Sequence, residues 1–194
     1  IKEGLAYTKS DPTLLGLVIM AFLPSLFGFT YFALMPAWAR EALNVQSDGL
    51  GYLLTVMGAG ALVGTLILAS LRSFSKRGML LLMAALIWGM GMAAFSQMTS
   101  FLAAMPFLFL VGMLSSVYMS LNMTLLQVYA SKEMRGRVMS LSMMTFGVMP
   151  LSAVPFGAVA ESIGTPNALF ISGLILVGAT AIFGLAYPKF RRIA

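Results

Sequence analysis

The chain has 194 residues, of which 60% are apolar and only 9% are charged, and its formal net charge is +6. Ordinary soluble domains carry about 25% charged residues, so this composition excludes a soluble globular domain. It also excludes a disordered chain, because disordered segments are poor in apolar residues. The sequence contains no histidine and no cysteine, which removes disulfides, the usual zinc sites and histidine-dependent catalysis. We therefore expect an integral membrane protein with no metal, no cofactor and no enzymatic activity.

Long uncharged runs mark the membrane-spanning segments, since a helix needs about 20 apolar residues to cross a hydrocarbon core of about 30 Å. Charged residues divide the chain into five such runs, and the polar segment 96–100 divides the longest run in two. The sequence thus predicts an all-α membrane protein in which residues 13–187 form a bundle of six transmembrane helices. The predicted spans are 13–36, 50–71, 79–96, 101–129, 138–160 and 166–187. Residues 1–12 form a lead-in segment, and residues 188–194 form a basic tail.

Two patterns inside the predicted spans concern helix geometry. Pro24, Pro106, Pro150 and Pro155 lie within predicted spans, where each removes a backbone hydrogen bond and favours a kink. Because the fifth span contains two of them, we expect it to be the bent element. Gly60 and Gly64 lie four residues apart in the second span, and small residues at this spacing allow a neighbouring helix to approach closely.

Basic residues are distributed unevenly between the two sides of the predicted bundle. One side holds eleven of the twelve lysines and arginines: Lys2, Lys9, Arg72, Lys76, Arg77, Lys132, Arg135, Arg137, Lys189, Arg191 and Arg192. The other side holds only Arg40. Because cytoplasmic loops are enriched in Lys and Arg, the sequence predicts that both termini lie in the cytoplasm. The positive charge is then explained by topology and by contact with anionic lipids, and no nucleic-acid partner is expected.

Neutral polar residues concentrate in the fourth predicted span, and the runs contain no charged residue at mid-membrane. Ser116, Ser120 and Gln127 fall on one helix face, and Asn122 falls on another. These residues either form hydrogen bonds between helices or line a water-filled path. In the first span, Phe27 and Tyr31 either stack on a planar substrate or face lipid.

Two cytoplasmic loops carry basic motifs. The loop between the second and third spans contains Arg72, Lys76 and Arg77, and the loop between the fourth and fifth contains Arg135-Gly136-Arg137. Taken alone, both motifs indicate basic anchors that bind lipid phosphate or cap helix carbonyls.

Several segments follow one another in an order that carries a family resemblance. They are Glu3-Gly4-Leu5-Ala6-Tyr7 before Asp11-Pro12, the loop from Arg72 to Gly78, Asn122 with Gln127, Arg135-Gly136-Arg137-Val138-Met139-Ser140, Phe146-Gly147, Pro150-Leu151, Gly157-Ala158-Val159-Ala160-Glu161 and Gly164. This series resembles the C-terminal half of a major facilitator superfamily transporter. It is most similar to the bacterial branch that contains enterobactin exporters and transmembrane secretion effectors. The loop from Arg72 to Gly78 lacks the aspartate of the family's basic motif, so the resemblance implies no gating ion pair at that position.

The resemblance implies a specific function for the chain. It would be one six-helix bundle of a secondary active exporter, and residues 1–12 would be the end of the central loop. The partners implied are a small amphipathic substrate of drug or siderophore type, the lipid bilayer of the bacterial inner membrane, and a missing N-terminal six-helix half. Substrate would lie between the halves and alternating access would move it, with proton exchange as the driving force. By this analogy Phe27, Tyr31, Ser116, Ser120, Asn122 and Gln127 are the candidate residues of the pathway.

Two other functions remain open for a six-helix membrane protein. One is a scaffold or assembly protein that acts through helix packing alone. The other is the membrane domain of an ATP-driven exporter, although the short cytoplasmic connections offer little surface to an ATPase.

Overall fold

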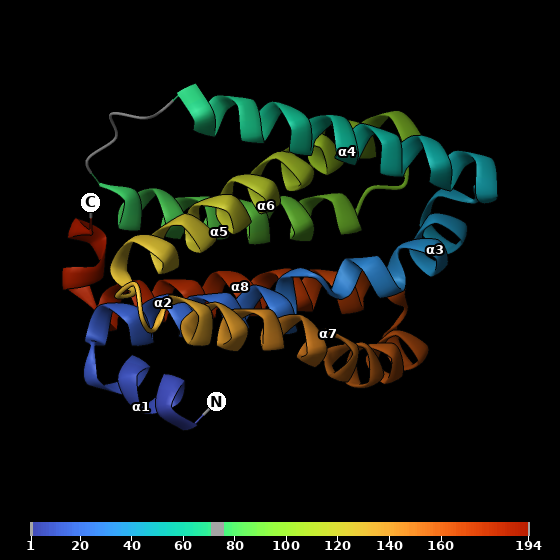
Figure 1. The fold of residues 1–194 in the computed structure, drawn as a ribbon. Helices are drawn as coiled ribbons and strands as arrows, with labels where there is room; N and C mark the ends of the chain where they lie inside the picture. The colour runs from blue at the N-terminus through green and yellow to red at the C-terminus, as the bar shows by residue number, and fades with distance from the viewer. Residues whose placement is uncertain (1, 71–75, 194) are drawn as a thin grey trace.

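The computed structural model describes residues 2–70 and 76–193 (Figure 1). Its elements in chain order are α1 (Lys2–Ser10), α2 (Pro12–Leu23), the π-helical segment η1 (Pro24–Gly28), α3 (Thr30–Leu43), α4 (Ser47–Ser70), α5 (Arg77–Ser96), α6 (Phe101–Tyr129), α7 (Arg135–Ile163), α8 (Thr165–Ala186) and the 3-10 segment η2 (Pro188–Arg192). Six segments of the described chain are long and apolar enough to cross a membrane, namely Pro12–Leu43 and each of α4 to α8. The predicted all-α membrane fold with six spans is confirmed.

Some helices extend beyond the predicted spans. The first span continues to Leu43 rather than residue 36, and it ends where Asn44 adopts a left-handed conformation with φ of 53°. Helix α7 begins at Arg135 rather than residue 138 and ends at Ile163 rather than residue 160. The predicted limits followed the uncharged runs, whereas a helix can continue into the polar zone and carry its charged residues there.

The connections divide between the two ends of the bundle. In Figure 1, α1, the α6–α7 connection and the C-terminus lie toward the left end, and the α3–α4, α5–α6 and α7–α8 connections lie at the right end. We call the left end the basic end, because the described basic residues other than Arg40 belong to the elements that meet there. The two ends therefore differ in charge as the sequence predicts.

Helix α1 is a short separate helix that is attached to the basic end. The Arg137 guanidinium, at the start of α7, forms an ion pair with Glu3. The backbone N–H of Ser131 donates a hydrogen bond of 3.2 Å to the Tyr7 hydroxyl. Asp11 then caps α2 by accepting a hydrogen bond of 2.7 Å from the Thr13 N–H. Helix α1 is thus joined to α7 by side chains and to α2 by a capped turn.

Large aromatic side chains fill the core between the first span and α5. Trp38, Trp88 and Phe95 are fully buried. The Trp38 ring lies 5.1 Å from the Phe95 ring in an edge-to-face arrangement, and its indole N–H donates a 2.8 Å hydrogen bond to the Ser96 carbonyl. Rings in this geometry attract one another beyond the effect of burial, so this cluster fixes α3 against α5.

Glycines bring the backbones of α4 and α6 into direct contact. A Cβ atom placed on Gly60 would lie 2.1 Å from the Phe109 carbonyl oxygen, and one on Gly112 would lie 2.0 Å from the Met57 carbonyl oxygen. Gly64 meets the Met113 carbonyl in the same way. The close approach predicted from Gly60 and Gly64 is confirmed, and α6 is the helix that uses it.

Candidate substrate pathway at the break in the first span

The first span is not a continuous α-helix, because Pro24–Gly28 form a π-helical turn between α2 and α3. Pro24 has no N–H to donate to the Met20 carbonyl one turn earlier. The Tyr118 hydroxyl, on α6, donates a hydrogen bond to that carbonyl instead. After the break, the Phe29 N–H donates a 2.8 Å hydrogen bond to the Pro24 carbonyl. Irregular backbone is tolerated at membrane depth where protein groups satisfy it, and here α6 supplies such a group.

Other carbonyls of the first span also accept hydrogen bonds from neighbouring helices. The Asn122 side-chain amide donates a 3.1 Å hydrogen bond to the Leu17 carbonyl. On α8, the Ser172 hydroxyl donates a 2.7 Å hydrogen bond to the Phe27 carbonyl and lies 3.1 Å from the Thr30 hydroxyl oxygen. Helices α6 and α8 therefore hold the break from two directions.

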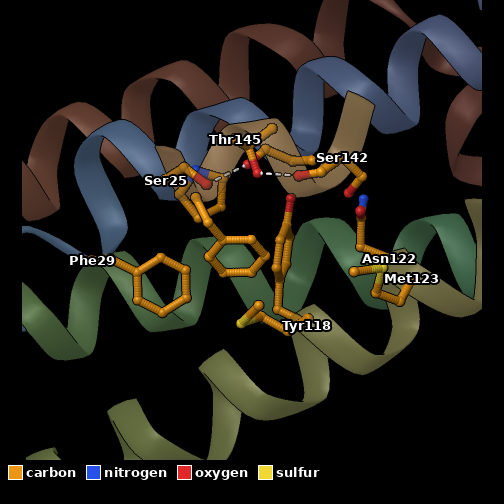
Figure 2. Close-up of a pocket in the computed structure, with 11 residues that line it drawn as sticks. Ser25, Phe29, Tyr118, Asn122, Met123, Ser142 and Thr145 are labelled. Carbon is orange, nitrogen blue, oxygen red and sulfur yellow. Dashed lines mark hydrogen bonds between the residues drawn. The ribbon is translucent and has the colours of Figure 1, made fainter. Parts of the chain in front are cut away.

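A small hollow opens beside the break, between the first span, α6 and α7 (Figure 2). Its lining residues are Ala21, Pro24, Ser25, Phe29, Tyr118, Met119, Asn122, Met123, Ser142, Thr145 and Phe146. The hollow has a volume of ≈ 20 Å³, which is enough for about one water molecule. We call it the break hollow.

The polar groups around the break hollow are hydroxyls and one amide. The Ser25 hydroxyl donates a 3.0 Å hydrogen bond to the Ala21 carbonyl, and the Thr145 hydroxyl donates a 2.6 Å hydrogen bond to the Ser142 carbonyl. Figure 2 shows the Tyr118 and Asn122 side chains extending from α6 toward the first span and α7. The lining carries no ionisable acid or base other than the Tyr118 phenol. The hollow can therefore bind a neutral polar group by hydrogen bonds but offers no fixed charge.

The predicted pathway residues divide between the hollow and the core. Asn122 lines the hollow and is buried. Phe27 lies in η1, where its partly buried ring stands 6.3 Å from the Phe156 ring of α7. Tyr31 is buried in the aromatic core, with its ring 6.5 Å from the Phe95 ring, and is absent from the lining of the hollow.

The other three predicted residues of α6 lie away from the hollow. The Ser116 hydroxyl donates a 2.9 Å hydrogen bond to the Ala61 carbonyl of α4, so this serine joins two helices. Ser120 is partly buried, and its carbonyl accepts a 2.7 Å hydrogen bond from the Thr124 hydroxyl. Gln127 is exposed in the last turns of α6, toward the basic end.

Four polar residues of the hollow were not among the predicted pathway residues: Ser25, Tyr118, Ser142 and Thr145. For Tyr118 the sequence does contain a signal, because it precedes Asn122 by one helical turn and shares its face. Ser142 and Thr145 are three residues apart on α7, a spacing that also places them on one face. The sequence does not show that these faces of α6 and α7 meet at the break in the first span; the structure does.

The basic loop motifs lie at the basic end, away from the hollow. Arg135, Gly136 and Arg137 form the exposed first turn of α7. Lys76 is exposed and precedes α5, and Arg77 is the first residue of that helix. Arg72 lies outside the described residues.

The fold and the hollow together define a class of protein. The described part of the chain has six apolar segments of membrane-spanning length, which is the arrangement of a multi-pass membrane protein, and a neutral polar hollow lies between the first of them, α6 and α7. Residues 1–192 match the family described as transmembrane secretion effector. The chain belongs to this family of the major facilitator superfamily, whose members are transporters and not enzymes.

A curated relative agrees with this assignment. The chain is 22% identical over 159 residues to a protein named "Staphyloferrin A transporter" from Staphylococcus aureus (strain NCTC 8325 / PS 47). The match covers 80% of this chain and 39% of the relative. The chain therefore spans about two fifths of the length of the relative that it matches.

Proposed function

We propose that the chain is the C-terminal six-helix half of a secondary transporter and that an N-terminal half completes the substrate pathway by alternating access. Helices α4 and α7 support this proposal, because large apolar side chains on both are exposed. They include Leu62 and Leu66 on α4, and Leu151 and Val154 on α7. Exposed faces of this kind suit a second bundle or lipid. The limited share of the relative that the match covers also favours a longer native protein.

The length of the native polypeptide tests this part of the proposal directly. We expect an antibody against residues 188–194 to detect a protein of about twice the length of this chain. A native product of 194 residues would contradict it, and the scaffold interpretation would then be preferred.

The proposed cargo is a small amphipathic molecule of drug or siderophore type, and the proposed direction is export. The polar groups around the break hollow support this cargo, because its hydroxyls and amide lie beside apolar side chains and offer no charge. The hollow holds only about one water molecule, so the cargo would bind against it where the other half widens the pathway. The direction rests on the family resemblance alone. The name of the relative favours a siderophore.

We place the protein in a bacterial inner membrane, with the basic end and both termini in the cytoplasm, following the distribution of Lys and Arg. Proton exchange would use carboxylates of the other half, since the spans of this chain have none at mid-membrane.

Within this chain, Asn122 is the candidate that contacts cargo, with Gln127, Ser120, Ser116, Phe27 and Tyr31 as further candidates. We expect Asn122→Ala in the complete protein to lower kcat/KM for transport about tenfold, because loss of a buried hydrogen-bonding group costs about 1–2 kcal/mol. Gln127→Ala is expected to lower it less, since Gln127 is exposed. The measurement is efflux from energised cells or vesicles.

Thr124→Val is the matched control, because Thr124 is an exposed hydroxyl residue on the same helix, outside the hollow. It should transport like the parent protein. If Asn122→Ala and Gln127→Ala both leave transport unchanged, the assignment of cargo contacts to α6 is wrong.

A further inference from the structure

A second opening lies between α5 and α8. These antiparallel helices touch at Gly89 and Gly173, where a Cβ atom on Gly89 would lie 2.9 Å from the Gly173 carbonyl oxygen. A Cβ atom on Gly173 would likewise lie 2.9 Å from the Ala93 nitrogen. About three turns nearer the basic end on α8 the contact is looser, since a Cβ atom on Gly184 would meet only the Leu82 side chain, at 3.4 Å, and no backbone of α5. The two helices therefore separate toward the basic end.

The C-terminal segment closes this gap at the basic end itself. The Gly78 N–H donates a 3.1 Å hydrogen bond to the Ile193 carbonyl. A Cβ atom on Gly78 would lie 1.9 Å from the Phe190 carbonyl oxygen, so η2 packs directly on the start of α5. Phe190 and Ile193 are both buried. A groove remains between the glycine contact and η2.

The groove has a volume of ≈ 350 Å³, which falls in the range of about 300–1,000 Å³ found for small-molecule sites. Its lining is apolar apart from one hydroxyl and one guanidinium, and consists of Met79, Leu82, Met83, Leu86, Thr180, Ala181, Gly184, Leu185 and Arg191. From Met79 to Leu86 it extends about 10 Å along α5. A groove of this length fits within one leaflet of a bilayer, because the whole hydrocarbon core is about 30 Å thick.

The two polar groups of the groove have unused hydrogen-bonding capacity. Thr180 is 1% exposed, and its hydroxyl oxygen is buried without a partner among the described residues. Arg191 donates a 2.9 Å hydrogen bond from Nε to the Gly184 carbonyl, which leaves the four N–H groups of its terminal nitrogens. Within the described part of the chain, no carboxylate lies within ion-pair distance of Arg191. Lys189, in the same segment, is exposed and adds positive charge at this end.

We propose that this groove binds an anionic phospholipid from the leaflet at the basic end. One acyl chain lies between α5 and α8, and Arg191 holds the phosphate at the mouth. Thr180 lies one helical turn deeper than Gly184, about 6 Å along the axis, which is where the ester carbonyls follow the phosphate in a glycerophospholipid. A donor at that depth and a guanidinium at the mouth match the order of polar groups in such a lipid. The excess of basic residues favours a headgroup with net negative charge.

Native mass spectrometry of the delipidated complete protein tests the proposal, with phosphatidylglycerol as the added lipid. We expect Arg191→Gln to weaken binding of the first phosphatidylglycerol about fivefold, as loss of one basic residue at an anionic surface predicts. Leu185→Trp, at a 72% exposed side chain of the groove, should fill the groove and weaken binding similarly without disturbing η2. Lys132→Gln is the control, because Lys132 is exposed at the same end but outside the groove.

Three results would overturn the proposal. The first is unchanged phosphatidylglycerol binding in both Arg191→Gln and Leu185→Trp, and the second is equal binding of phosphatidylcholine by the parent protein. The third is displacement of phosphatidylglycerol by millimolar inorganic phosphate, which would indicate a site for free anions. The assay measures lipid binding and no transport, so its failure would leave the proposed transport function standing.

Discussion

Gly60→Ala is expected to separate α4 from α6 and to lower the melting temperature of the protein in detergent by several degrees. The added Cβ atom would lie 2.1 Å from the Phe109 carbonyl oxygen, and a backbone carbonyl cannot rotate away as a side chain can. Overpacking of this kind costs about 1–3 kcal/mol or more. Gly112→Ala should act in the same way, because its Cβ atom would lie 2.0 Å from the Met57 carbonyl oxygen on the other side of the contact.

Gly58→Ala is the matched control for this experiment. A Cβ atom on Gly58, two residues earlier on α4, meets nothing within 4 Å. Alanine is a better helix former than glycine by about 1 kcal/mol, so this variant should melt at the parent temperature or above it. Melting is followed by the monodisperse fraction that survives stepwise heating. Equal melting of Gly60→Ala and Gly58→Ala would show that the two backbones do not touch.

Tyr118→Phe is expected to destabilise the protein by about 1–2 kcal/mol, since a buried acceptor left without a donor costs this much. The variant keeps the ring but removes the hydroxyl that donates to the Met20 carbonyl. That carbonyl depends on Tyr118 because residue 24 is proline and has no N–H. Transport should fall as well, because Tyr118 lines the break hollow.

A second substitution makes this prediction specific. Pro24→Ala supplies an N–H one turn after Met20, so the carbonyl regains a backbone donor. In the Pro24→Ala background, Tyr118→Phe should therefore cost clearly less stability than in the parent protein, and a double-mutant cycle measures the difference. Tyr52→Phe serves as the control, because Tyr52 is 66% exposed. Equal costs in both backgrounds would show that the hydroxyl does not replace the missing proline N–H.

The sequence was sufficient to predict the number of spans and the charge difference between the two ends. The first depends on the hydropathy of segments of about 20 residues and the second on the number of Lys and Arg residues in the loops, and local packing changes neither. The close approach of Gly60 and Gly64 could also be predicted, although its partner α6 could not. The limits of the spans were less accurate, because Arg40 and Arg135 lie in helices that continue past the apolar region.

The members of the break hollow could not be predicted, because they converge through a backbone irregularity. A proline signals a kink in general, but it does not show whether the turn becomes π-helical or which helix satisfies the free carbonyl. Polar residues within one helix also look alike in sequence. Ser116 bonds to α4 while Asn122 bonds to α2, and the choice depends on neighbours that are more than fifty residues away.

The wide turn at Pro24–Gly28 has a consequence for how the length of this span can vary among related proteins. A π turn closes its hydrogen bond over one residue more than an α turn does, so it stores one additional residue without rotating the helix that follows. Elsewhere between Pro12 and Tyr31, an insertion or deletion of one residue would turn Tyr31 and Trp38 by about 100° relative to α2. Single-residue gaps between family members should therefore fall within residues 24–28, and relatives with one residue fewer there should have an unbroken first span.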